Sequence, residues 1–212
     1  MFFCKRVFML GSILLMAPMA AMAAQIAPKP VAIEGFRSAH FGMSEADTLK
    51  AIKTDFNLSG NAVRTQVNPV QYTTALSVTV PALMPGSGAA AINYVFGYKE
   101  KRLIEVDVTW AASAPENSPK SLLQTGAMLQ NYFMNESFPP GSVAGGSLLA
   151  NGNLLLFRGS DAAGHAVGLF ISGPETHDAK ASKTNITPAL LTLAYVADPA
   201  HPDVFTIQPG RF

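Results

Sequence analysis

Two carboxylates stand two residues apart in one alternating segment of the chain. Glu105 and Asp107 alternate with apolar residues between positions 104 and 110. Side chains two positions apart on a strand point to the same side, so these two carboxylates are expected to be neighbours. Such a pair can carry acid–base chemistry. Basic residues at positions 99, 101 and 102 precede the pair and favour a solvated, charged strand face instead.

A hydrolase that acts on a polymer of the cell envelope is the enzymatic alternative. Its candidate acids are Glu105, Asp107, Asp161 and Glu175. A serine hydrolase would need a serine on a sharp turn with a histidine and an acid nearby. The run Gly141-Ser142-Val143-Ala144-Gly145 misses the G-x-S-x-G spacing by one residue and follows Pro139-Pro140, which indicates a turn. The sequence therefore assigns no catalytic residue.

The histidines and glycines show no spacing typical of a metal or phosphate site. The four histidines are His40, His165, His177 and His201. They lie far apart, and none has a histidine or carboxylate four positions further on, which argues against a dedicated zinc site. Two of them stand in the polar runs His177-Asp178 and His201-Pro202-Asp203, where we expect solvated loops. No glycine cluster precedes a helix as a phosphate-binding loop does, so no cofactor is expected.

Aromatic residues at alternating positions form the candidate binding set. They are Tyr94, Phe96, Tyr98 and Trp110. Aromatic strand residues usually belong to a core, but an exposed aromatic sheet face can bind a partner. A small-molecule carrier that uses the apolar face around Trp110 is a third functional hypothesis. The sequence leaves these placements open.

Alternation of apolar and polar residues predicts the strands that would position these side chains. In the first half the predicted strands are 76–80, 92–98 and 104–110. The short link 99–101 suits a hairpin, and residues 81–88 read as a longer loop. Strands joined in this way favour an antiparallel sheet.

Two amphipathic helices are predicted. The first spans 44–55, with Ser44 as its N-cap, and residues 57–61 end it. The second begins at Ser118-Pro119 and runs to about Asn135. Its predicted apolar stripe is Leu122, Leu123, Leu129, Tyr132 and Phe133.

A second set of strands follows the second helix. The predicted strands are 147–150, 154–158, 166–172 and a weaker apolar run at 190–196. The polar segment 176–187 is predicted to be a loop, and the proline-containing tail 198–212 is predicted to be extended.

The element order predicts an α+β fold with an antiparallel sheet and two main helices. After an extended lead-in at 24–35, residues 36–112 form one run of helix and strands. Residues 113–197 form either a second tandem module or a continuation of the same domain. No residue-level repeat relates the two halves, so duplication is suggested by element order alone.

The N-terminal segment has the features of a cleavable export signal. Lys5 and Arg6 precede an apolar run from 7 to 19, and Ala21-Met22-Ala23 offers a cleavage site before Ala24. The alternative of a retained anchor is disfavoured because the apolar run is shorter than the roughly 20 residues that cross a bilayer. Residues 1–23 are therefore interpreted as a signal peptide, which predicts a periplasmic or secreted protein.

Charge and cysteine content narrow the partners of the mature chain. The only cysteine of the sequence, Cys4, precedes the apolar run, so no lipid anchor is expected at the cleavage site. Cleavage would leave a mature chain without cysteine, which can form no disulfide. Loss of Lys5 and Arg6 reduces the 15 basic residues to 13, against 14 acidic ones. The charges are scattered in both signs, which excludes a nucleic-acid footprint. No later segment is apolar over a length that spans a membrane.

The residues that lead into the first predicted helix resemble a sequence motif of known envelope proteins. Residues 37–49 (Arg-Ser-Ala-His-Phe-Gly-Met-Ser-Glu-Ala-Asp-Thr-Leu) resemble the opening of small envelope modules of the BamE type and of the secreted β-lactamase inhibitor protein. Gly42 would allow a tight turn, Met43 would fold over the helix start, and Ser44 would cap it. The resemblance departs at Gly60, which is displaced from the family's glycine, and in the missing lipidated and disulfide-bonded cysteines.

The resemblance implies non-enzymatic protein binding in the envelope and transfers no specific partner. Together with the export signal and the missing catalytic motif, it leads us to expect a periplasmic protein-binding or envelope-assembly module. Its partner would be another envelope protein.

Overall fold

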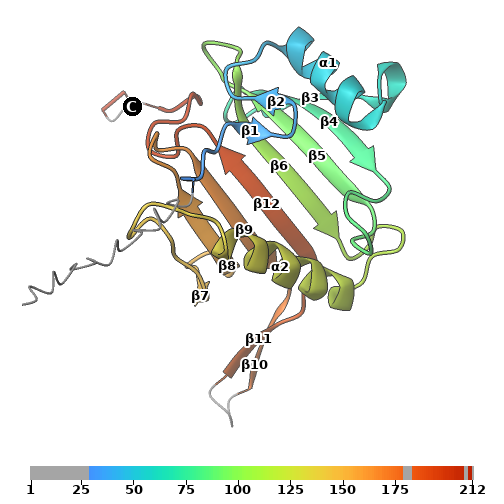
Figure 1. The fold of residues 1–212 in the computed structure, drawn as a ribbon, viewed down its shortest axis with the longest axis vertical. Coiled ribbons are helices and arrows are strands. Elements are labelled where there is room, and N and C mark those ends of the chain that lie inside the picture. The colour runs from blue at the N-terminus through green and yellow to red at the C-terminus, as the bar shows by residue number, and fades with distance from the viewer. Residues whose placement is uncertain (1–28, 179–182, 208–209, 212) are drawn as a thin grey trace, which may run out of the picture.

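The computed structural model describes residues 29–178, 183–207 and 210–211, so the predicted signal peptide and its cleavage site lie outside the described residues. The described chain folds as α+β, with two α-helices, an eight-stranded antiparallel sheet and two short two-stranded sheets (Figure 1). Its elements are β1 (Gly35–Phe36), β2 (Ala39–His40), α1 (Glu45–Phe56), a 3-10 turn (Gly60–Ala62), β3 (Arg64–Val67), β4 (Thr74–Val80), β5 (Ala90–Phe96), β6 (Leu103–Ala111), α2 (Pro119–Met134), β7 (Ser147–Leu148), β8 (Leu154–Ser160), β9 (Ala166–Ser172), β10 (Glu175–Asp178), β11 (Lys183–Ile186) and β12 (Leu190–Val196). The predicted fold class is confirmed.

Helix α1 begins and ends as its sequence predicts. The Ser44 side chain accepts a hydrogen bond from the backbone N–H of Asp47 at 3.2 Å, which satisfies one free donor of the first turn. At the other end Asn57 adopts a left-handed conformation, and its N–H bonds to the Lys53 carbonyl. The polar residues that bound the predicted helix 44–55 are therefore its actual caps.

The Gly42-Met43 pair ties the start of α1 to the sheet. Gly42 has a φ of +81°, a conformation that glycine adopts without strain. Its N–H donates to the Leu103 carbonyl at 2.8 Å, and the Leu103 N–H donates to the Met43 carbonyl at 2.9 Å. Met43 also packs against the core. The phrase that precedes the helix thus fixes α1 to the first residue of β6.

Helix α2 has the predicted cap and a narrower buried face than predicted. Ser118 and Ser121 form a reciprocal capping box ahead of Pro119. The buried side of the helix consists of Leu122, Thr125, Gly126, Leu129 and Phe133. Leu123 and Tyr132, which the predicted stripe included, are 50% and 57% exposed. Both lie outside the stripe, about 100° wide around the helix axis, that the buried positions share.

All neighbouring strands of the large sheet run antiparallel, in the order β3-β4-β5-β6-β12-β9-β8-β7. The apolar run that looked weakest in the sequence, at 190–196, is the central strand β12. It pairs with both β6 and β9 over its whole length. Leu191 and Leu193 are buried there. A strand without charged residues suits the middle of the sheet, because both its neighbours shield it from solvent.

The two halves of the chain occupy the sheet in the same order. In each half a helix is followed by strands that proceed from one edge of the sheet towards its centre, β3 to β6 in the first and β7, β8, β9 and β12 in the second. The halves meet at the antiparallel β6–β12 ladder. Both contribute to one hydrophobic core, so the helix-then-strands runs form a single continuous sheet.

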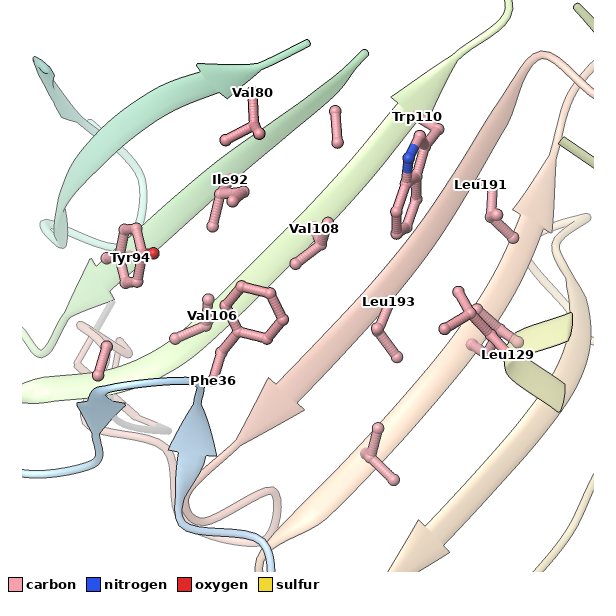
Figure 2. Packing of buried hydrophobic residues seen from close by; sticks show 14 of the residues in the cluster. Phe36, Val80, Ile92, Tyr94, Val106, Val108, Trp110, Leu129, Leu191 and Leu193 are labelled. Atoms are coloured by element: carbon pink, nitrogen blue, oxygen red, sulfur yellow. The ribbon is translucent and has the colours of Figure 1, made fainter. Parts of the chain in front are cut away.

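Both helices cover the same face of this sheet, shown towards the viewer in Figures 1 and 2. Leu129 of α2 and Ile52 of α1 belong to one buried cluster with the inward side chains of the central strands. Phe36 from the β1–β2 hairpin fills the same layer and contacts the Tyr195 ring at 5.7 Å between centroids. The opposite face of the sheet receives neither helix.

The segment 176–187 is not a loop, and this prediction is wrong. β10 and β11 form an antiparallel hairpin whose register runs from Glu175↔Ile186 to Asp178↔Lys183. The hairpin projects away from the main sheet (Figure 1). Among the described residues of the hairpin, only Ile186 packs against the core, so the segment has no apolar alternation for sequence periodicity to reveal.

The tail closes one end of the sheet. Residues 198–207 contain no helix or strand, as predicted for an extended tail. The Asp203 carboxylate accepts hydrogen bonds from the N–H groups of Lys99 at 3.0 Å and Glu100 at 3.0 Å. The Phe205 N–H donates to the Gln71 carbonyl. Asp203 therefore clamps the β5–β6 turn, which corrects the prediction of a solvated side chain in this loop.

The central position of β12 predicts a large stability effect at a residue in its apolar run. Replacing buried Leu193 by alanine should lower the free energy of unfolding by about 2–5 kcal/mol, because the cavity lies between two packed strands. Leu148→Ala, at the exposed edge strand β7, is the matched control and should cost less than about 1 kcal/mol. Urea denaturation of both variants measures the difference. Equal losses would contradict the central placement.

Candidate functional site

The sheet face opposite the helices, called here the open face, carries mostly polar and small side chains. Alternation along the strands assigns these residues to it, and the pairing registers bring them into rows. In the six neighbouring strands β3, β4, β5, β6, β12 and β9, the open-face residues include Arg64, Gln66, Ala75, Ser77, Thr79, Ala91, Asn93, Val95, Glu105, Asp107, Thr109, Thr192, Ala194, Gly168 and Phe170. One row runs Arg64, Ser77, Asn93, Asp107 and Ala194 across five strands. This polar face is the candidate functional site.

Three of the four aromatic residues predicted for binding lie in the core instead. Tyr94 and Trp110 are 0% exposed, Phe96 is 2% exposed, and Tyr94 and Trp110 point into the helix-covered layer in Figure 2. Burial also raises the pKa of the Tyr94 hydroxyl. Of the two placements that the sequence leaves open for these three residues, the structure has the core one.

Tyr98, the fourth candidate, and Phe170 lie outside this layer. Tyr98 lies in the β5–β6 turn, beyond the end of β5, and packs near Tyr72 and Phe205 with ring centroids 5.9 and 5.6 Å away. Phe170 lies on the open face, and its ring edge occupies the space beside Gly168 where a Cβ would otherwise be. Sequence alternation in β9 could have placed Phe170, but its neighbours are apolar on both faces.

Glu105 and Asp107 lie side by side on the open face of β6. Their partners across the neighbouring strands are Val95 and Asn93 on β5, and Val196 and Ala194 on β12. None of these four residues carries a charge. The two side chains are only partly exposed, and each carboxyl affects the protonation of the other.

Burial gives this pair an unusual protonation equilibrium. Desolvation, followed by the adjacent Glu105 carboxyl, raises the pKa of Asp107 to about 7. Desolvation also raises the pKa of Glu105. Two carboxyls this close share a proton readily because the second negative charge is costly. The prediction of a fully solvated strand face is therefore wrong at this pair.

The basic residues that precede β6 do not neutralise the pair. Within the described chain, no lysine, arginine or histidine lies within 4.0 Å of either carboxylate. Lys101 instead reaches over the Tyr98 ring, 5.5 Å from its centroid. The acids thus face the open side of the sheet without a countercharge.

A hollow of about 580 Å³ lies beside the carboxyl pair. Its lining comes from four consecutive strands, β3 to β6, and from the turn between β3 and β4. The lining residues are Gln66, Val67, Asn68, Pro69, Gln71, Thr73, Ala75, Asn93, Val95, Glu105 and Asp107. Two are acidic and none is basic. We call this feature the acidic hollow.

The acidic hollow continues into a second hollow of about 330 Å³. Gln66 and Asn93 line both, and Arg64 lines the second one only. The Ser77 hydroxyl donates to the Asn93 side-chain oxygen and orients this amide between them. Together the hollows form a polar depression under the edge strand β3, of the size that binding sites usually have.

Thr73 places an unused hydroxyl at the acidic hollow. The residue is 2% exposed, and its side chain shares the parity of Ala75 and Ser77, which point to the open face. Its backbone carbonyl accepts from the Asn68 N–H, while its hydroxyl makes no hydrogen bond to any residue the structure describes. The hydroxyl is not fully enclosed, so a ligand in the hollow can reach it.

The other acids predicted for catalysis lie apart from this pair. Asp161 is buried in the β8–β9 turn, where it accepts from the N–H groups of Ile33 at 2.8 Å, Ala163 at 2.9 Å and His165 at 3.0 Å. It therefore holds the turn and the lead-in strand together. Glu175 begins β10, in the projecting hairpin. Neither lines the acidic hollow.

The remaining polar candidates have structural roles. The Ser142 hydroxyl donates to the Pro139 carbonyl at 2.8 Å, as expected for a turn. His165 lies 3.4 Å from Asp161, and His40 and His201 lie near Glu34 and Asp198 at 3.7 and 3.6 Å. In the part of the chain that the structure covers, no three histidine, cysteine or acidic side chains gather as metal ligands would.

Comparisons with known proteins add no further identification. The chain matches no protein-family model, no curated protein and no solved structure at a significant level. Among the described residues, neither α-helix combines the length and apolar character needed to traverse a bilayer.

The raised pKa of Asp107 predicts a specific pH dependence of stability. Because the folded pKa exceeds the ordinary value of 3.8, the folded chain binds more protons than the unfolded chain between about pH 4 and pH 7. This group therefore costs stability progressively as the pH rises through that window. Asp107→Asn should raise the free energy of unfolding by about 1–3 kcal/mol at pH 8 and change it little at pH 4.

Thermal and urea unfolding of the wild type and Asp107→Asn at both pH values checks this expectation. Glu100→Gln, in the exposed β5–β6 turn, is the control and should have a similar effect at the two pH values. A variant that destabilises equally at pH 4 and pH 8 would show that Asp107 is not held in a desolvated site.

Proposed function

We propose that this protein is an exported binding module of the cell envelope that docks another protein on its open face. The observation that carries the proposal is the Glu105–Asp107 pair, which stands without a countercharge in a hollow of a sheet face that no helix covers. Desolvating two carboxyls costs stability and serves no evident purpose in the fold. A binding partner supplies the missing compensation.

Exposed apolar side chains beside the hollow favour a macromolecular partner. Val67 lines the hollow and is 67% exposed, while Val70 and Tyr72 in the adjoining turn are 76% and 51% exposed. Phe205 packs edge-on against Tyr72, with ring centroids 4.8 Å apart, and brings the tail to the same end of the sheet. Clustered exposed apolar residues with polar surroundings are typical of protein interaction sites.

Sequence features support the same class of function. The predicted signal peptide implies export, and residues 37–49 resemble the helix start of small envelope binding modules. The resemblance includes Gly42 and Ser44, which act in the structure as the turn and cap that it implies. No catalytic motif in the sequence points to a competing activity with equal weight.

Site-specific photo-crosslinking in the envelope of the producing cell tests the proposal. A photoreactive residue at Gln66, which is exposed and lines both hollows, should capture a specific partner reproducibly. The same residue at Lys120, exposed on helix α2 and remote from the open face, is the matched control. Equal capture at both positions, or none at Gln66, would contradict docking on the open face.

A hydrolase remains the second candidate because the same carboxyl pair could exchange protons near neutral pH. General acid–base residues work best when their pKa lies near the working pH, and the pKa of Asp107 is about 7. The two carboxyls are neighbours on one strand face and affect each other's protonation, as in a shared-proton dyad, whereas glycosidase acids stand apart on either side of the scissile bond. Peptidase chemistry is therefore the form of this alternative to test.

Turnover of peptidase, esterase and glycosidase substrates by the purified protein decides between the candidates. The binding-module proposal expects no turnover above background, and Glu105→Gln together with Asp107→Asn should leave that background unchanged. Peptide hydrolysis that disappears in this double variant, while the protein stays folded, would establish the enzymatic alternative.

A further inference from the structure

We propose that the acidic hollow receives an arginine side chain of the docking protein, with the guanidinium held by the Glu105 and Asp107 carboxylates. This inference rests on the proposed function and names the chemistry of the partner. It commits to a peptide-borne guanidinium on a protein surface. A free polyamine and a lysine ammonium are outcomes that the test separates from it.

Charge complementarity is the first argument. The lining of the acidic hollow contains two carboxyls and no basic residue, and the facing positions on β5 and β12 are Asn93, Val95, Ala194 and Val196. Arg64 and Arg158, the basic residues in the open-face row of Asp107, each stand three strands from it, and neither lines the acidic hollow. The site therefore attracts a cation that the described chain does not provide.

The walls of the hollow match an amphipathic side chain. Val67, Pro69, Ala75 and Val95 provide apolar surface between the mouth and the carboxyl pair. An arginine can lay its aliphatic stem along such surface while its charged end reaches the acids. A hydrated metal ion or a sugar would leave these apolar walls unmatched. The volume of about 580 Å³ leaves room for flanking parts of the partner's chain.

The hydrogen-bonding groups favour guanidinium over ammonium. Guanidinium presents five N–H donors in a planar fork that suits two adjacent carboxylates, and it is less strongly hydrated than ammonium. The Thr73 hydroxyl is not fully enclosed and offers a further acceptor at the same hollow. A bound guanidinium would donate to Thr73 and neutralise the acids together.

Binding should depend on pH with a defined sign. Protonation of the pair removes its negative charge, so an arginine binds the deprotonated form. Arginine binding therefore favours release of the proton from the pair. No histidine lines either hollow, and Arg64 lines only the adjoining one, so the carboxyl pair is the titrating unit that faces the ligand. Affinity should therefore rise as the pH increases from 5 to 8.

An NMR titration of the protein purified after export tests the inference directly. The probe is N-acetyl-arginine N-methylamide, and the matched control is the same compound of citrulline, which has the same shape without the charge. The arginine probe should change the backbone amide shifts of Gln66, Thr73, Asn93 and Asp107. Its dissociation constant should be at least tenfold lower than that of the citrulline compound. Capped lysine and spermidine form the other two arms.

The double variant Glu105→Gln/Asp107→Asn should weaken arginine binding at least tenfold, and Glu100→Gln should leave it unchanged. Thr73→Val should weaken it less, about twofold to tenfold, as expected for one neutral hydrogen bond. Tighter binding of lysine or spermidine, equal binding of citrulline, or shifts elsewhere on the protein would overturn the inference.

Crosslinking at Gln66 separates failure of this inference from failure of the proposed function. If the partner is captured equally by the wild type and the double variant, the open face docks a protein but its acids do not hold an arginine. If neither captures a partner while the arginine probe still binds at the hollow, docking of a protein fails and the guanidinium site stands. The inference predicts capture by the wild type and reduced capture by the double variant.

Discussion

The antiparallel ladder between β6 and β12 is the contact on which the rest of the structure depends. It joins strands from the two halves of the chain over seven residue pairs, from Leu190↔Ala111 to Val196↔Glu105. On the helix-covered face this ladder carries Trp110, Val108, Leu191 and Leu193, which link the two ends of the core. Without it each half would be a helix on a four-stranded sheet with one more edge exposed to solvent.

Placing both helices on one face of this sheet creates the conditions for the candidate site. The covered face absorbs the large aromatic residues, and the open face keeps small and polar ones, of which Ala75 and Ala194 form part of a low floor. Glu105 and Asp107 stand on the same strand as Trp110 but face the other way. They are partly desolvated at a hollow that the β3–β4 turn also lines, and two such acids without a countercharge favour a cationic partner.

Sequence reasoning recovered elements whose determinants are local. Ser44 and Ser118 cap helices because their hydroxyls reach N–H groups three residues away, and Asn57 ends α1 because asparagine tolerates the left-handed region. It missed the β10–β11 hairpin, which has no apolar alternation, and misjudged Leu123 and Tyr132, whose exposure depends on what lies beside α2. For the site, alternation placed Glu105 and Asp107 together but could not tell how much water they retain.

By itself the sequence determined the α+β class, the two helices with their caps, seven of the eight strands of the large sheet and the shared face of the two acids, because short-range hydrogen bonding and side-chain period decide these features. The tertiary structure alone decided that 190–196 is the central strand, that Tyr94, Phe96 and Trp110 belong to the core, and that residues from 66 to 107 line one hollow. These outcomes depend on strand order and on which face the helices cover. Both are set by packing between residues far apart in the chain, which one-dimensional spacing does not encode.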